Sequence, residues 1–372
     1  MTGIYIHIPF CVKKCPYCDF FSQTDLSVLT EYMTALKNQT RGLPAREVDS
    51  IYIGGGTPSV LSGAQVGELL SIVRNQVGIN PDNEITIEVN PLGCDTEKLR
   101  AYRNAGINRI SVGAQSLNDR TLKLLGRQHS VRDISTALDN AKNAGFNNIS
   151  VDLILALPDD DEEKISLAVN TLEDKGVKHI SFYLLKITEG TPFYDHPPDL
   201  LPDDDRTADL YLFIVEKLRS KGFIQYEISN FSQEGYESRH NLKYWNSDEY
   251  IGLGAAAHSL TDKKRYSFPA DIQAYIDCFS NLSGNWMKGA VVEGKEEWQD
   301  YLMLRLRTTM GLSHKSMENR YDFKFNANMK RLLALYETKG LLYRNKDILR
   351  LTVPGMLVSN SIISSFLAEA EK

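Results

Sequence analysis

Three cysteines stand close together near the start of this 372-residue chain, in the run Cys11-Val-Lys-Lys-Cys15-Pro-Tyr-Cys18, directly after a strand-like segment at 4–8. Because short loops separate them, the three thiols can converge on one metal centre. Three protein ligands leave a fourth position open, as catalysis or substrate chelation requires. A closed structural site would need a fourth donor, and the position two residues after Cys18 is Phe20.

The spacing favours an iron–sulfur cluster over a zinc ion or free thiols, although it leaves all three open. Zinc modules normally bring a second pair of cysteines or a cysteine–histidine pair. Cys94 and Cys278 are isolated, and no histidine stands at a matching distance.

Strand-like and helix-like segments alternate over the first 222 residues. Strands are expected at 3–8, 49–53, 84–89, 108–113, 148–154 and 179–185, with a weaker one at 223–229. Amphipathic helical segments lie at 25–41, 62–77, 95–105, 131–144, 161–175 and 204–221. This alternation indicates parallel strands with right-handed crossovers, in a doubly wound sheet or a barrel.

The two faces of these strands differ in polarity. Isoleucine and valine occupy one face, whereas the other carries Tyr5, His7, Glu88, Gln115 and Asp152. A doubly wound sheet is apolar on both faces. The pattern therefore favours an α/β fold in which six strands form an open, partial (β/α)6 barrel with a polar, ligand-filled interior.

The remaining sequence suggests two further parts. The segment 223–295 has no clear periodicity and is expected to connect the barrel to residues 296–372. There, helical stretches surround a short β-like pair at 341–343 and 348–351, which predicts an α-rich, winged-helix-like domain.

The composition argues against a nucleic-acid-binding, membrane-spanning or secreted protein. A net charge of −6 gives no general attraction for nucleic acid, and no run of about eighteen apolar residues is present. The first residues show no secretory signal, and clustered cysteines fit a reducing compartment. These features predict a cytoplasmic protein.

The cysteine spacing resembles the signature of the radical S-adenosylmethionine (SAM) superfamily, Cys-x3-Cys-x2-Cys after the first strand. The resemblance implies a [4Fe-4S] cluster held by Cys11, Cys15 and Cys18. It also implies SAM bound to the fourth iron and cleaved after one-electron reduction.

Further motifs are similar to the oxygen-independent coproporphyrinogen III oxidase group, and with the C-terminal region they cover nearly the whole chain. They include Gly54-Gly-Gly-Thr-Pro58, Glu88-Val-Asn-Pro91, Gly113-Ala-Gln115-Ser and Gly126-Arg127. The likeness implies these cofactor-site residues: Tyr5, Phe20, Gly55, Gly56, Thr57, Glu88, Gln115, Arg127 and Asp152. Glycines let the backbone approach the SAM amine, Arg127 can bond the carboxylate, and Glu88, Gln115 and Asp152 can bond the amine or ribose. A purely structural role is the alternative: a turn for the glycines, a surface charge for Arg127, and buried hydrogen bonds for Glu88, Gln115 and Asp152.

Two departures bring the chain closer to the HemW-type haem chaperones. Phe20 replaces a further cysteine of the oxidases, and the first strand starts at residue 3, without their N-terminal extension. A motif associated with haem in that subgroup, HNxxYW, is present as His240-Asn-Leu-Lys-Tyr244-Trp245. On residue type alone, His240 and Trp245 would be structural; the resemblance favours haem involvement.

Three functions compete. The first is a haem chaperone that passes haem to acceptor haemoproteins, with respiratory proteins at the membrane as implied clients. The second is a coproporphyrinogen III oxidase, and the third a zinc-stabilised barrel of unrelated activity. The retained SAM residues suit an enzyme better than a passive carrier, unless the cluster gates haem release or formation of a homodimer. Phe20 and the missing extension favour the chaperone.

Overall fold

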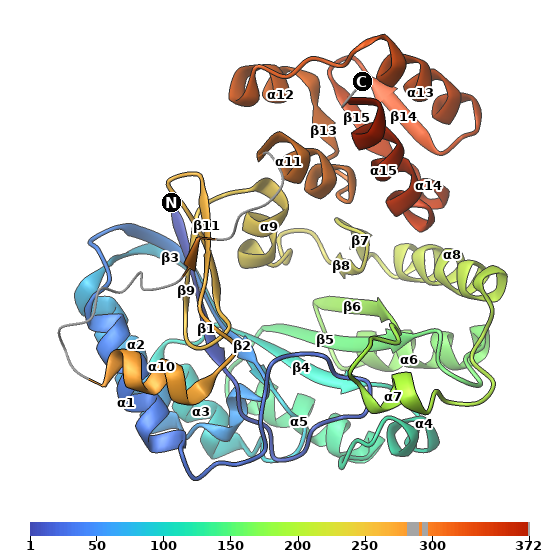
Figure 1. Cartoon of the computed structure of the whole chain (residues 1–372). Helices are drawn as coiled ribbons and strands as arrows, with labels where there is room; N and C mark the ends of the chain where they lie inside the picture. Colours follow the sequence, from blue (N-terminus) through green and yellow to red (C-terminus); the bar gives the residue numbers. More distant parts are fainter. Residues whose placement is uncertain (281–289, 292–296, 371–372) are drawn as a thin grey trace. The chain divides into compact units, whose positions relative to one another are not determined.

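The computed structural model describes residues 1–280, 290–291 and 297–370 (Figure 1). Contacts divide the chain into two units. The first comprises Met1–Pro202 and Glu249–Val292, and the second comprises Asp203–Asp248 and Glu293–Lys372. These boundaries differ from those expected at 222 and 295, because the middle segment is shared between the units.

The first unit is built on a parallel sheet. Its six consecutive strands are β1 (Thr2–Ile8), β2 (Glu47–Gly55), β3 (Gly78–Val89), β4 (Arg109–Gln115), β5 (Asn148–Leu155) and β6 (His179–Leu184). Each pairs with the next in parallel. This order confirms the predicted arrangement of six β/α repeats.

Helices cover the apolar face of this sheet (Figure 1). The main ones are α1 (Leu29–Arg41), α2 (Gly63–Gln76), α3 (Thr96–Ala105), α5 (Val131–Asn143) and α6 (Glu162–Asp174). Ile4, Ile6 and Ile8 are fully buried, as their alternation on β1 predicts. Ser62 and Gln65 form a capping box at the start of α2. Shorter helices are η1 (Pro58–Val60), α4 (Asp119–Leu124) and α7 (Pro192–Asp195).

The sheet also extends beyond β1, which the sequence did not predict. Strand β9 (Tyr250–Leu253) pairs with β1 in parallel. The antiparallel strands β10 (His258–Thr261), β11 (Lys264–Ser267) and β12 (Ala290–Val291) follow. Helix α10 (Ile272–Phe279) packs on α1. The buried Tyr32 hydroxyl fixes this edge, because it donates to the His7 carbonyl and accepts the Ala255 N–H.

The second unit is mainly helical, with α8 (Asp204–Ser220), α9 (Arg239–Asn246), α11 (Glu297–Leu306), α12 (His314–Tyr321), α13 (Ala327–Thr338), α14 (Val353–Leu357) and α15 (Ser359–Ala370). Strands β13 (Leu312–Ser313), β15 (Ile348–Leu351) and β14 (Leu342–Asn345) form an antiparallel sheet in that order. This is the winged-helix-like arrangement predicted from the sequence. The segment expected as one strand at 223–229 is instead a pair of short antiparallel strands, β7 (Ile224–Gln225) and β8 (Asn230–Ser232). The Ser229 N–H donates to the Glu227 carboxylate and closes the turn between them.

None of the helices in the described part of the chain has the length and apolar composition that crossing a bilayer takes.

Candidate functional site

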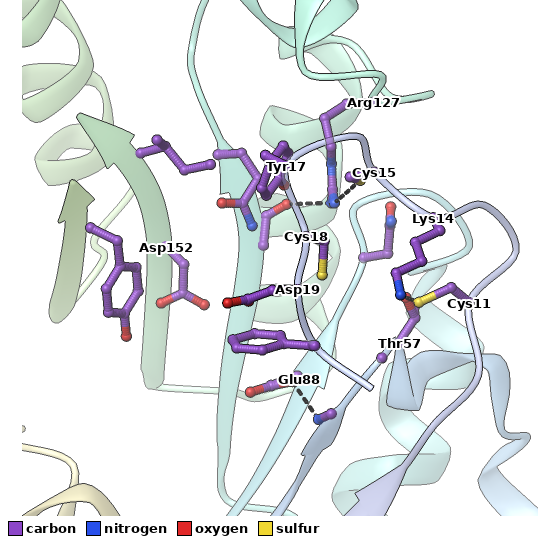
Figure 2. A pocket seen from close by; sticks show the side chains of 18 of the residues that line it. Cys11, Lys14, Cys15, Tyr17, Cys18, Asp19, Thr57, Glu88, Arg127 and Asp152 are labelled. Atoms are coloured by element: carbon purple, nitrogen blue, oxygen red, sulfur yellow. Dashed lines mark hydrogen bonds between the residues drawn. The ribbon is translucent and has the colours of Figure 1, made fainter. Parts of the chain in front are cut away.

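A cavity of about 430 Å³ is lined by residues at the carboxyl ends of the parallel strands and by the cysteine loop (Figure 2). This volume is within the range of roughly 300–1,000 Å³ typical of ligand pockets. The cavity brings together most of the side chains expected from the sequence: Cys11, Cys15, Cys18, Phe20, Gly55, Gly56, Thr57, Glu88, Gln115, Arg127 and Asp152. Distant motifs meet here because the strands are parallel and end at one edge.

The cysteine loop is fixed by backbone hydrogen bonds. The Cys11 N–H donates to the Gln23 carbonyl at 2.9 Å, and the Phe193 N–H of α7 donates to the Pro16 carbonyl at 3.0 Å. Two further bonds reach the sulfurs directly. Thr57 Oγ1 donates to Cys11 Sγ at 3.3 Å, and Arg127 Nη1 donates to Cys15 Sγ at 3.4 Å. Donors aimed at sulfur are typical of thiolate metal sites, where they tune the bound group.

The three thiols face one cavity without forming a site for a single ion. Within the described ranges, no three side chains of histidine, cysteine, aspartate or glutamate lie close enough together to hold one metal ion. A four-iron cluster places each cysteine on a different iron, so its thiolates lie farther apart than those around one zinc ion. The three thiols that line this cavity are ligands of the kind that a four-iron cluster takes.

Two glycines at the end of β2 bring the backbone close to the cysteine loop. The Gly56 N–H donates to the Ile8 carbonyl at 3.0 Å. A Cβ on Gly56 would lie 2.7 Å from the Phe10 carbonyl oxygen and 3.0 Å from Cys11 Sγ. Gly55 has φ +119°, and a Cβ there would meet the His7 ring. Only glycine suits either position.

Glu88 and Asp152 are half-buried carboxyl groups on neighbouring parts of the cavity wall. Glu88 accepts hydrogen bonds from the Tyr52 hydroxyl at 2.9 Å and the Gly55 N–H at 3.1 Å. Burial, and then the nearby charge of Asp152, raise the pKa of Glu88 to about 7. Asp152 accepts from Ser111 at 2.9 Å and Ser181 at 2.7 Å, and burial raises its pKa as well. Such acceptors suit the hydroxyl or ammonium groups of a ligand.

Gln115 and Arg127 occupy a strained part of the wall. Gln115 has φ +68° and follows an irregularity in the β4–β5 register. Non-glycine residues rarely adopt this conformation, and such strain is concentrated at functional sites. Arg127 is held by the Gly113 carbonyl at 2.8 Å as well as by Cys15.

Tyr5 supports the wall rather than forming it. Its hydroxyl lies 2.9 Å from His7 Nδ1, and its ring stacks on Tyr52. His7 Nε2 lies 3.0 Å from the Phe21 carbonyl, which can only accept, so Nε2 carries the proton. Nδ1 therefore accepts from Tyr5, and this chain of bonds ties β1 to the end of the cysteine loop.

Three aromatic residues in and beside the cysteine loop differ in their exposure to solvent. Phe10 is fully buried, and Tyr17 lines the cavity against Phe193. Phe20 also lines the cavity, but its exposure is 64%, so it lies open at the rim. Tyr52, which holds Glu88, was missed by the sequence analysis, although its alternation with Ile51 and Ile53 was a usable signal.

The HNxxYW motif lies on α9 of the second unit. Ser238 caps this helix by accepting the Asn241 N–H. His240 is fully buried, and its Nε2 lies 2.9 Å from the Tyr244 hydroxyl with the rings edge to face. Trp245 is half-buried.

Comparisons with known proteins agree with this architecture. Residues 5–172 match the radical SAM superfamily, and residues 292–358 match the HemN C-terminal domain. The chain is 33% identical to the heme chaperone HemW of Bacillus subtilis, covering 99% of this chain and 100% of that protein. Identity to HemW of Escherichia coli is also 33%, over 99% and 98% of the two chains. The Synechocystis HemW is 34% identical, over 100% and 97%.

The chain belongs to the HemW family.

A solved structure of E. coli coproporphyrinogen III oxidase, HemN, shares the fold of this HemW-family chain. The TM-score is 0.82 at 22% identity, over 98% of this chain and 90% of that one. Membership of the radical SAM superfamily implies a [4Fe-4S] cluster and SAM. The thiols, glycines and carboxyl groups around the cavity are a donor set that fits both.

Proposed function

We propose that this HemW-family chain is a haem chaperone that binds haem, a [4Fe-4S] cluster and SAM, and transfers haem to acceptor haemoproteins. Similarity over essentially the full length to heme chaperones from several bacteria is the observation that carries the proposal. Respiratory haemoproteins at the membrane are the acceptors that the resemblance implies.

In this proposal Cys11, Cys15 and Cys18 hold the cluster. When bound, the cluster supplies one open iron position for the amino and carboxylate groups of SAM, and an electron. Thr57 and Arg127 place hydrogen-bond donors on two of the thiolates. Such bonds stabilise the thiolate form and tune the potential of the centre.

The rest of the cavity would orient SAM. Gly55 and Gly56 leave room for close backbone approach, and Glu88 and Asp152 supply acceptors for its ammonium and ribose hydroxyls. Gln115 can donate from its amide, and Arg127 can pair with the carboxylate. Tyr5 keeps Tyr52 and His7 in place behind this wall.

Haem involvement of His240, Tyr244 and Trp245 is proposed from the motif. Imidazole is a common axial ligand to haem iron. Because His240 Nε2 is bonded to the Tyr244 hydroxyl, ligation through Nε2 requires this bond to open. Tyr244 would then act as the residue that holds His240 in the haem-free state.

The competing function is oxidative decarboxylation of coproporphyrinogen III. The likeness to HemN supports a shared fold, and the retained SAM-site residues are compatible with radical chemistry. Phe20, in place of the oxidases' further cysteine, favours the carrier. The cluster would then serve haem release or assembly of a homodimer.

The test is an anaerobic haem titration of the protein with its cluster reconstituted, beside a coproporphyrinogen assay with SAM and reductant. We expect stoichiometric haem binding, transfer to an apo-haemoprotein, and no porphyrinogen turnover. His240→Ala should weaken haem binding, whereas His258→Ala, which removes an exposed histidine, should not. Turnover to protoporphyrinogen without stable haem binding would overturn the chaperone proposal in favour of the oxidase.

A further inference from the structure

The pairing of β4 with β5 is irregular where β4 reaches the cavity. Gly113 pairs with Asp152 and Gln115 pairs with Leu153, so Ala114 is one residue more than β5 can match. Such a bulge leaves the extra residue out of the regular pairing and changes the direction of a neighbouring side chain. The chain enters the left-handed region at Gln115, with φ +68°, and Gln115 lines the cavity.

The side chain of His129 binds this bulge. Ala114 is fully buried, and its carbonyl oxygen lies 3.0 Å from His129 Nε2. A buried carbonyl needs a hydrogen-bond donor, because leaving it unsatisfied costs free energy. His129, only 3% exposed, supplies that donor to the residue directly before Gln115.

The surroundings make His129 a neutral donor. A carbonyl can only accept, so Nε2 carries the proton. Within the described residues, the buried Nδ1 has no hydrogen-bond partner. Burial, and then the charge of Arg127, lower the pKa of His129 to about 4. The bond to the Ala114 carbonyl and the charges of Asp133 and Asp119 oppose this shift. The single N–H of the neutral ring is therefore used on the bulge.

Arg127 binds the same bulge. Its Nη2 donates to the Gly113 carbonyl at 2.8 Å, and its Nη1 donates to Cys15 Sγ at 3.4 Å (Figure 2). A Cβ on Gly113 would lie 3.0 Å from Gln115 Nε2 and 3.6 Å from Arg127 Nη2, so both groups lie against this glycine. The positions of the Gln115 amide and the Arg127 guanidinium therefore both depend on the shape of the bulge.

We propose that His129 is a positioning residue of the SAM site. Its N–H holds the bulge in the conformation that directs the Gln115 amide into the cavity beside Arg127. A non-glycine residue in the left-handed region persists only where its surroundings hold it there. His129 acts through Gln115 rather than by touching SAM, because its N–H is bonded to Ala114. The inference rests on the SAM binding of the proposed function.

The test compares two amide replacements in the protein with its cluster reconstituted. His129→Gln places an amide N–H near the position of Nε2 and can still donate to the Ala114 carbonyl. His129→Asn places its amide near the position of Nδ1 and falls short of that carbonyl. SAM affinity is measured by equilibrium dialysis, and the paramagnetic resonance of the reduced cluster with and without SAM is the second readout. Leu138→Ala, at a buried position on α5, is the control for a general loss of stability.

We expect His129→Asn to weaken SAM binding by about tenfold, the scale of one lost buried hydrogen bond, and His129→Gln to remain within about threefold of the unmodified protein. Leu138→Ala should unfold more easily but bind SAM normally. In a Gln115→Ala background, His129→Asn should have little further effect on SAM affinity, because residues that act through one another are not additive.

Unchanged SAM affinity in both His129 variants, or an equal loss in both, would overturn the role of the N–H. The full loss in the Gln115→Ala background would overturn the route through Gln115. If His129→Asn does not fold, His129→Gln decides: normal affinity supports the proposal, and a tenfold loss contradicts it. Failure of the unmodified protein to bind SAM would overturn the proposed function instead.

Discussion

The polar side chains of the cysteine-lined cavity and those of the HNxxYW helix have opposite surroundings. Around the cavity, Glu88 and Asp152 are half-buried and line open space, and their removal from water raises the pKa of each. On α9, His240 is fully buried and bonded to Tyr244 one turn later on the same helix. In the first region the carboxyl groups already line a cavity that can hold a ligand. In the second, the hydrogen bond between His240 and Tyr244 has to break before His240 Nε2 can bind a ligand.

The difference separates two kinds of functional motif. Cavity residues come from several strands, so their convergence is evidence for a shared task. The residues of the HNxxYW motif are neighbours on one helix, and their proximity would arise in any helix. The evidence for a functional rather than a structural role is therefore weaker for His240 than for Arg127. The following experiments test the two regions separately.

The largest effect is expected at the cluster. Cys15→Ser removes one of three thiolate ligands, so the reconstituted protein should lose most of its iron and sulfide and the associated absorbance. Cys278→Ser, on α10, should retain both. If Cys15→Ser kept a full cluster, the assignment of this cavity would be wrong.

A smaller effect is expected for Gly56→Ala. The new Cβ would lie 2.7 Å from the Phe10 carbonyl, so the cysteine loop has to move. We expect a loss of about 1–3 kcal/mol in the free energy of unfolding, and a less stable cluster. Gly67→Ala is the matched control, because a Cβ there meets only Ala105 at 3.8 Å and alanine favours helix. Equal denaturation midpoints for the two variants would show that the loop tolerates the displacement.

The raised pKa of Glu88 predicts a pH dependence of stability. The native carboxyl has a pKa of about 7 against 4.5 in the unfolded chain, so the native state binds the extra proton between these values. Stability should therefore be greatest below pH 4.5 with respect to this group and should fall as the pH rises to about 7. The loss is on the order of 3 kcal/mol at most. Asp152 adds to the shift, whereas Tyr52, the Gly55 N–H and Arg109 oppose it.

Glu88→Gln should flatten that part of the pH profile in chemical denaturation of the cofactor-free protein. Glu163→Gln, at an exposed position on α6, should leave the profile unchanged. An unaltered slope in Glu88→Gln would mean that Glu88 has the same pKa in the native and unfolded states, and therefore that water reaches its carboxyl group in the cavity.

The smallest effect is expected for Tyr244→Phe. This change removes the hydroxyl that meets His240 Nε2 but keeps the ring, and should cost about 1 kcal/mol of unfolding free energy. Tyr343→Phe, at an exposed position in the same unit, should cost nothing measurable. If Tyr244 restrains His240, haem affinity should rise in Tyr244→Phe. A marked loss of haem affinity would place Tyr244 in direct contact with haem.

Local patterns were sufficient to predict the parallel strands and part of the cavity wall, whereas Gly55, Gly56 and Arg127 were expected only from the family resemblance. Alternation along β1, β3, β4 and β5 identified which side chains face inward, and the chain order of parallel strands brought Glu88, Gln115 and Asp152 together. The extension through β9 was missed because Tyr250–Leu253 is short and finds its partner on β1, far away in sequence. The exposure of Phe20, which lines the cavity as expected but lies open at its rim, was not predictable, since residue type does not reveal which side of a loop faces solvent.

The pairing of β9 with β1 also affects the order in which the protein can be made. Gly3 leaves the ribosome long before its partner Tyr250, which follows only after the whole of α8 and α9, helices that belong to the other unit. Until then one edge of β1 is an unpaired strand edge, which can join other chains. The nascent chain therefore passes through a long interval in which its first strand has to be protected from aggregation. A shortened gene that ends at residue 222 would leave that edge open permanently.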